Sequence, residues 1–268
     1  MSKVSKEKDF HRWVKAAGLD TFSQFMTKSV GELLDSGRNG RELRRLKISI
    51  KDQTRIFYLK RLVREPFSKL IQMVLFGYLP RSGPLREQLL LKRLNNAGFA
   101  TMRTVAYGEK RRFGWPVSGF LLVEEVQGAE VAEVYQGCST VTRHQIMDAL
   151  GEYLGRLHKA GFFQAVRLKD LFLQEGLNNI DGVFDFVLID RETSKPGPSR
   201  FTKKRSLETL ARATRRTLRD GYLIGRGEIR SFCHGYHRAV GQSLGLSCTT
   251  LRRELFFAYR QEMQRARR

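Results

Sequence analysis

The chain contains few cysteines, few prolines and few acids. Of its 268 residues, 3 are cysteine and 6 are proline. Three scattered cysteines argue against a disulfide framework and are typical of a reducing compartment. No apolar run approaches the roughly 20 residues that cross a bilayer, and even the run from Leu70 to Leu79 is interrupted by Gln72 and Gly77. The basic start of the chain is not followed by the apolar core of a signal peptide, so we expect a cytoplasmic protein.

The shortage of acids leaves a large excess of positive charge. Lysine and arginine number 49 against 27 aspartates and glutamates, which gives a formal net charge of +22. Such a field favours an anionic partner, whether nucleic acid, an acidic membrane surface or a phosphorylated substrate. The basic residues are spread along the chain and are not interleaved with aromatics as in RNA-binding proteins. We therefore expect no nucleic-acid partner and keep a nucleic-acid-binding protein only as a third hypothesis.

Cysteine and histidine come close together once. Cys233, His234, His237 and Cys248 could suggest a metal site, but their spacing matches no zinc motif. Residues 228–241 have the apolar spacing of an amphipathic helix. We expect an ordinary helix there.

The apolar content of 41% is that of a globular protein, and its periodicity changes along the chain. Residues 8–19 predict either an interfacial membrane helix or a helix packed on the domain, and their short apolar face favours the second. Strand patterns dominate the first half and helical patterns the second. The expected helices are 8–19, 21–35, 67–79, 85–97, 142–160, 206–220, 227–243 and 248–267, and the expected strands are 46–50, 55–62, 103–108, 119–126 and 183–189.

This distribution predicts an α+β fold with two lobes. We expect an N-terminal helical extension over residues 1–40, a strand-rich N-lobe over 41–126 and a helical C-lobe over 127–268. The lobes would meet at the end of the apolar strand that runs into Val126.

Charged residues follow one another in an order typical of kinases. Lys60 lies in a strand, Glu87 lies on the next clear helix, and Asp190 ends the apolar strand 183–189. Kinases hold ATP and magnesium with a strand lysine, a helix glutamate and a strand-end aspartate in this order. Each residue also has an ordinary explanation: a strand lysine extending to solvent, a carboxylate near a helix N-terminus, and an exposed strand end.

Residues 85–109 carry the most specific pattern. They read Leu-Arg-Glu-Gln-Leu-Leu-Leu-Lys-Arg-Leu-Asn-Asn-Ala-Gly-Phe-Ala-Thr-Met-Arg-Thr-Val-Ala-Tyr-Gly-Glu. This stretch resembles the Kdo/WaaP family of bacterial lipopolysaccharide core kinases, and the resemblance extends over roughly residues 40–240. It implies a two-lobed protein-kinase-like fold and ATP-dependent phosphorylation of a heptose or Kdo sugar in the inner core.

The resemblance also implies roles for individual residues. Lys60 would contact the α and β phosphates of ATP and pair with Glu87, and Asp190 would hold Mg²⁺. Backbone groups between Glu124 and Val126 would bind adenine. The glycine loop is not evident, because residues 36–40 offer two glycines without the expected spacing. The implied partners are the lipopolysaccharide core, or another anionic glycolipid, and the inner-membrane surface, where the protein would be peripheral.

The catalytic loop departs from the family pattern. The family has His-x-Asp after an Ala-Gly pair, but this chain has Gln164 and Val166 in those places and Leu171 at the following metal position. Valine cannot accept the proton of a substrate hydroxyl. The nearest carboxylate is Asp170, which could serve as the base only in a rebuilt loop. The sequence thus leaves two main hypotheses, a sugar kinase with impaired transfer and a nucleotide-binding pseudokinase with a scaffolding or regulatory role in envelope biogenesis.

Overall fold

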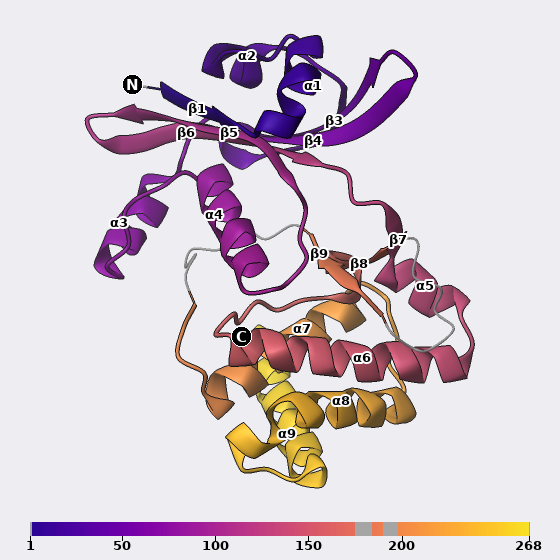
Figure 1. Ribbon diagram of the computed structural model, residues 1–268. Coiled ribbons are helices and arrows are strands. Elements are labelled where there is room, and N and C mark those ends of the chain that lie inside the picture. Colours follow the sequence, from indigo (N-terminus) through magenta and orange to yellow (C-terminus); the bar gives the residue numbers. More distant parts are fainter. Residues whose placement is uncertain (1, 175–183, 190–197, 268) are drawn as a thin grey trace. The chain divides into compact units, whose positions relative to one another are not determined.

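The computed structural model describes residues 2–174, 184–189 and 198–267 (Figure 1). The chain divides into two compact units, and the division falls between Val126 and Gln127. The first unit is rich in strands and the second is rich in helices. The position of the division is therefore the place where the sequence pattern changes from strands to helices.

The first unit is built on a six-stranded sheet in the order β1-β5-β6-β4-β3-β2. All of its neighbouring strands are antiparallel. The strands are β1 (Ser2–Lys6), β2 (Glu32–Gly37), β3 (Arg41–Ile50), β4 (Gln53–Leu62), β5 (Thr104–Arg112) and β6 (Trp115–Glu124).

The side chains of β4 alternate between the two faces of this sheet. Phe57 and Leu59 are buried in a core that also contains Phe10 and Trp13. The short helices η1 (Lys8–Phe10), α1 (His11–Ala16) and α2 (Phe22–Thr27) cover this face (Figure 1). Because successive strand residues face opposite sides, Lys60 lies on the other face, where α4 (Gly83–Asn96) packs.

The N-terminal segment differs from the prediction in its second half. The helix expected over 21–35 ends at Thr27, and β2 begins at Glu32. The chain leaves the helix in an extended conformation at Lys28, and Gly31 adopts a φ of 65° that suits a turn before the strand. The interfacial-membrane alternative for 8–19 is wrong, because Trp13 is buried in the core.

Strand β2 lies at the edge of the sheet and is solvent-exposed along its whole length. Leu33 pairs with Arg44 and Asp35 pairs with Leu43, so Leu34 is an extra residue on β2. One extra residue opposite a regular strand is a β-bulge, which bends the strand and interrupts the ladder.

The second unit combines a small sheet with a helical bundle. Its strands β7 (Gly128–Glu130), β8 (Leu171–Gln174) and β9 (Phe186–Leu188) form a three-stranded antiparallel sheet. The helices are α5 (Val131–Gly137), α6 (Thr140–Lys159), η3 (Leu168–Asp170), α7 (Lys203–Arg219), α8 (Arg226–Leu244) and α9 (Cys248–Arg267). The sequence predicted the four long helices, but not β7, β8 or α5.

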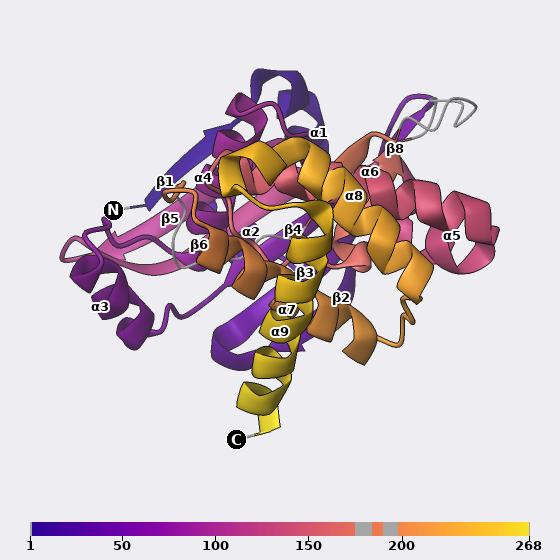
Figure 2. The ribbon, with the colours of Figure 1, turned by 90° about the horizontal axis from the view of Figure 1, so that it is seen from below.

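Helices α6 and α8 lie side by side in both views (Figures 1 and 2). Their close approach depends on glycine: a Cβ on Gly235 would collide with the carbonyl oxygen of Asp148, and one on Gly151 with that of Phe232. None of the helices in the described ranges combines the length and the apolar content needed to cross a membrane.

Candidate active site

Lys60 and Glu87 form an ion pair within the first unit. The Nζ of Lys60 lies 2.6 Å from Oε1 of Glu87, and the two side chains are only 16% and 7% exposed. Lys60 comes from β4 and Glu87 from α4, so the pair joins the sheet to the helix that packs on it. A lysine held in this way can present its charge to a phosphate while Glu87 fixes its direction.

A buried network holds the N-terminal end of α4. Arg86 donates to Glu65 at 2.9 Å, and both side chains are almost completely buried. The other oxygen of Glu65 accepts the amide of Gly83 at 2.8 Å, and Glu109 accepts the amide of Ser82 at 2.6 Å. Carboxylates at a helix N-terminus are favoured by the helix dipole. The network therefore fixes the helix turn that carries Glu87.

This network was not predicted. Glu65 and Glu109 are isolated acids in basic surroundings, and that isolation was the available signal.

The segment expected to bind adenine follows β6. The Glu124 carboxylate accepts from Arg55 at 2.8 Å, and the Glu125 carboxylate accepts the Tyr58 hydroxyl at 2.9 Å. Burial, and then the neighbouring Glu125, raise the pKa of Tyr58. The Glu124 and Glu125 side chains contact the sheet, and their amides donate to the carbonyls of Arg103 and Ile56. Of this segment, the backbone of Val126 alone makes no hydrogen bond within the described ranges.

Of the two glycines in residues 36–40, Gly37 ends β2 and Gly40 lies in the turn between β2 and β3. Arg38, Asn39 and Gly40 form this turn, and Asn39 and Gly40 have φ near 63° and 65°. The ladder places Leu43 of β3 opposite Lys60 of β4. The turn is therefore attached to the strand next to the lysine, although it lacks the usual glycine spacing.

In the second unit, α6 leads into the candidate catalytic loop. Gly161 has a φ of 88°, and a Cβ there would lie 2.5 Å from the carbonyl oxygen of Ser199. His158 is completely buried, and its Nδ1 lies 2.9 Å from the Tyr236 hydroxyl. Burial lowers the pKa of His158 to about 3. The positive φ and the close approach of Ser199 therefore require glycine at position 161. His158 is a neutral residue of the core.

The loop places Val166 inside the protein. Val166 is buried, and its amide donates to the Gln164 carbonyl at 2.9 Å. The side-chain oxygen of Gln164 is buried and has no hydrogen-bond partner among the described residues. Neither side chain can take a proton from a hydroxyl group at neutral pH.

Asp170 is buried and held by Arg167. Its carboxylate accepts the Arg167 amide at 2.8 Å and the Arg167 Nη2 at 2.7 Å. Its backbone carbonyl accepts the amide of Ile189 at 3.0 Å, which ties the loop to the end of β9. Asp190, the expected Mg²⁺ ligand, lies outside the described residues.

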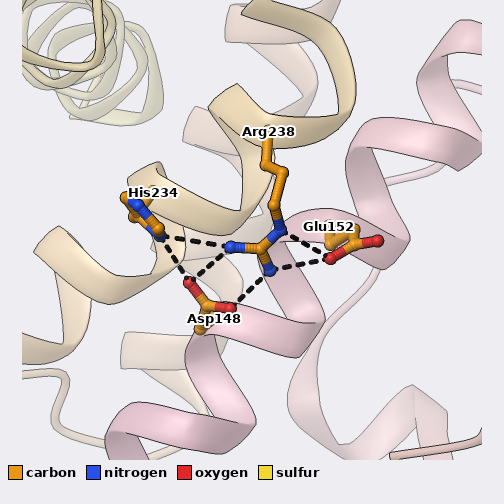
Figure 3. A network of polar contacts seen from close by, with 4 residues as sticks. All are labelled: Asp148, Glu152, His234 and Arg238. Carbon is orange, nitrogen blue, oxygen red and sulfur yellow. Dashed lines mark hydrogen bonds and ion pairs between the residues drawn. The ribbon is translucent and has the colours of Figure 1, made fainter. Parts of the chain in front are cut away.

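A second polar cluster joins α6 to α8 (Figure 3). Arg238 donates to Asp148 at 2.5 Å and to Glu152 at 2.7 Å, and His234 lies 3.0 Å from Asp148. Burial raises the pKa of Asp148, but hydrogen bonds from Arg238 and His234 outweigh this and lower it. The cluster borders an open pocket of about 580 Å³. These contacts clamp two helices together.

The described ranges contain no group of three His, Cys, Asp or Glu residues placed to hold a metal. Cys233 is buried between helices, and His237 Nε2 lies 2.7 Å from the Leu246 carbonyl oxygen. These contacts fit the expected helix over 228–241.

Comparisons with known proteins place the chain in a family. The profile of the lipopolysaccharide kinase (Kdo/WaaP) family matches residues 26–229, which is well over half of the chain. A solved structure of WaaP in complex with acyl carrier protein aligns with a TM-score of 0.61 at 19% identity, covering 96% of this chain and 99% of that one. This likeness confirms the expected α+β, two-lobed kinase-like fold. A search of curated proteins found no match.

Two further solved structures are less similar. The kinase domain of maize SIRK1 bound to AMP-PNP aligns with a TM-score of 0.36 at 7% identity, over 89% of this chain and 74% of that one. WbdD aligns with a TM-score of 0.43 at 14% identity, over 86% of this chain and 46% of that one. By the extent of the profile match and the fold it shares with WaaP, the chain belongs to the lipopolysaccharide kinase (Kdo/WaaP) family.

Proposed function

We propose that this protein binds Mg-ATP and phosphorylates an inner-core sugar of lipopolysaccharide, a heptose or Kdo. The observation that carries the proposal is the buried pair of Lys60 and Glu87 at 2.6 Å. A lysine fixed in this way is the part of a kinase site that meets the α and β phosphates. The protein would work in the cytoplasm, peripheral at the inner membrane.

The other parts of the proposed nucleotide site are assigned by analogy with the order of parts in kinases. The turn at residues 38–40 would cover the phosphates, and backbone groups near Glu124 and Val126 would bind adenine. Asp190 would hold Mg²⁺, which neutralises phosphate charge when bound. ATP supplies the phosphoryl group, and the chain supplies its orientation.

Transfer would be slow because Val166 occupies the position of the base. A positioned base contributes roughly 10² to 10⁴ in rate. Asp170 stays a candidate for this role, but its carboxylate would first have to leave Arg167.

A nucleotide-binding pseudokinase is the second candidate function. The burial of Val166 and the closed pair of Asp170 and Arg167 favour it. Such a protein would bind ATP and take a scaffolding or regulatory role in envelope biogenesis without turnover.

Two measurements test the proposal together. Thermal unfolding with and without Mg-ATP reports binding, because a ligand of the native state raises its melting temperature. Phosphate incorporation into purified core oligosaccharide reports transfer. Binding with transfer supports the kinase, binding without transfer supports the pseudokinase, and the absence of both rejects the nucleotide site.

The proposed partner is the lipopolysaccharide core or another anionic glycolipid, which the net charge of +22 would attract. The solved WaaP structure contains acyl carrier protein. Purification of this chain with such a carrier protein would test whether it shares that partner.

A further inference from the structure

The first unit exposes several large apolar side chains on α3 (Phe67–Leu75), on the segment after it and at one hairpin tip. Leu75 is 79% exposed, Leu79 is 73% exposed and Phe113 is 88% exposed. They come from α3, the turn that follows it, and the tip of the β5–β6 hairpin. We call this the α3–hairpin surface, and its exposed apolar members are Phe67, Ile71, Val74, Leu75, Phe76, Leu79 and Phe113.

Two contacts make the helix and the hairpin one surface. The rings of Phe67 and Trp115 lie 5.5 Å apart, and Arg111 donates to the Pro80 carbonyl at 2.9 Å. Below the surface, Arg86 lies 3.6 Å from the Met73 sulfur and is paired with Glu65. The surface is therefore anchored to the buried network that also holds α4.

Helix α3 is apolar over more of its circumference than the unit covers. Leu70 and Met73 are buried, whereas Phe67, Ile71 and Val74 on the adjoining arc are exposed. At 100° per residue these positions and Leu75 span about 200° of the helix. In an ordinary surface helix, only the side that packs against the protein is apolar. The exposed apolar residues of α3 are therefore not explained by packing.

Phe113 occupies a backbone conformation that is unfavourable for a bulky residue. It has a φ of 50° in a two-residue hairpin turn, followed by Gly114 with a φ of 80°. Such turns favour Asn or Gly at the first position, because a bulky side chain is strained at positive φ. A strained residue that is almost fully exposed points to a task outside the fold.

Within α3, its flanking segments and the hairpin tip, the exposed charged side chains of the described residues are basic. Arg64, Lys69, Lys110 and Arg112 are exposed there. The single acid between residues 63 and 81 is Glu65, which is buried against Arg86. The segment 110–115 contains no acid. The two segments that carry the apolar residues therefore also carry exposed cations.

We propose that the α3–hairpin surface inserts into the headgroup region of an acidic lipid bilayer. Exposed aliphatic and phenylalanine side chains accompanied by Lys and Arg are the composition that binds such an interface. Both α3 and the hairpin tip protrude at the outer edge of the first unit in both views (Figures 1 and 2). Protruding side chains can enter the headgroup region before the rest of the unit meets the bilayer. The inference extends the proposed membrane location and does not require phosphotransfer.

The experiment uses the full chain and vesicles in the absence of nucleotide. Flotation compares phosphatidylcholine vesicles with vesicles that also contain phosphatidylglycerol. The chain has 2 tryptophans, and Trp13 is buried, so half-exposed Trp115 reports contact with lipid. We expect binding only to the acidic vesicles, with a blue shift of the emission that Trp115→Phe removes.

Two variants change the surface without changing its charge. Leu75→Gln with Leu79→Gln should weaken vesicle binding on the order of tenfold, because each leucine loses its apolar burial. Phe113→Asn should weaken it while leaving the melting temperature equal or higher, since Asn suits positive φ. The matched control is Phe256→Gln with Phe257→Gln, which removes two exposed aromatics from α9 in the second unit.

Several outcomes would overturn the inference. These are equal binding to neutral vesicles, unchanged binding of the α3 and Phe113 variants, or loss of binding in the α9 control. Unchanged vesicle binding together with loss of a protein partner would assign the surface to that partner instead. Lys60→Ala should bind vesicles normally, so a failure of the kinase proposal and a failure of this one give different results.

Discussion

Arg167 surrounds the Asp170 carboxylate with its own amide at 2.8 Å and its guanidinium at 2.7 Å. Arg167 also reaches Asp220 at 3.2 Å, so it joins the loop to the end of α7. An aspartate engaged in this way stabilises the loop. It would serve as a base only if the loop opened.

Asp170→Asn separates these two roles. If Asp170 anchors the loop, the variant should lose about 1 to 3 kcal/mol of unfolding free energy. The half-buried Arg167 would keep Asp220 but lose the nearer of its two carboxylate partners. Urea unfolding measures this loss, and any residual phosphotransfer should persist. A variant of native stability without any transfer would instead identify Asp170 as the base. Asp20→Asn, at an exposed acid on the other unit, is the matched control.

Lys60→Ala should abolish the stabilisation by Mg-ATP. For the parent protein, nucleotide at 100 times its Kd would stabilise the fold by about 2.7 kcal/mol. Removing the ammonium group would take away the proposed contact with phosphate and the ion pair with Glu87. Calorimetry with and without Mg-ATP checks the result. Lys69→Ala, at an exposed lysine, should keep the full shift, and an equal shift in Lys60→Ala would reject the site.

Val166→Asp with Gln164→His should raise phosphate transfer to core oligosaccharide. The two changes restore the His-x-Asp pattern, and a base there is worth roughly 10² to 10⁴ in rate. Val166→Asn with Gln164→His keeps the shape but cannot accept the proton, so it should stay slow. Equal rates for the two double variants would show that the missing base does not limit the reaction.

The buried histidine makes stability depend on pH. Burial lowers the pKa of His158 from 6.5 to about 3 in the folded protein. The unfolded chain therefore binds a proton that the native state does not bind between these values, and stability falls as the pH drops below 6.5. The loss should reach about 2 kcal/mol at pH 5.

Urea unfolding at pH 8 and pH 5 checks this effect. His158→Gln should be less stable at pH 8 because it repacks the core, but its stability should fall less between the two values. His11→Gln, at an exposed position, should follow the parent protein. A parallel fall in His158→Gln and the parent would show that other groups govern the acid sensitivity.

The sequence predicted the elements that carry strong periodicity. The helix over 248–267 and the helices near 85–97 and 227–243 were found because their apolar positions repeat over several turns. Strands β7 and β8 were missed because three or four residues give no measurable alternation. The helix expected over 21–35 was too long because apolar Leu33 and Leu34 fit a helical pattern, although they lie on the edge strand β2.

The candidate site divides in the same way. The pairing of Lys60 with Glu87 could be predicted from their order along the chain and the family resemblance. The structure places the two side chains 2.6 Å apart. The partnership of Glu65 with Arg86 could not be foreseen, because it depends on how α4 lies against the sheet. The burial of Val166 and the capture of Asp170 by Arg167 depend likewise on loop packing, which local sequence does not encode.

The bulge at Leu34 has a consequence for how molecules of this protein meet. A regular edge strand offers a row of unpaired amides and carbonyls on which the edge of a second molecule can pair. The extra residue interrupts that row halfway along β2, and Glu32 and Asp35 add charge on either side of it. Deleting Leu34 would restore a straight edge, and the altered protein should form sheet-to-sheet dimers or fibres at concentrations where the parent protein stays monodisperse.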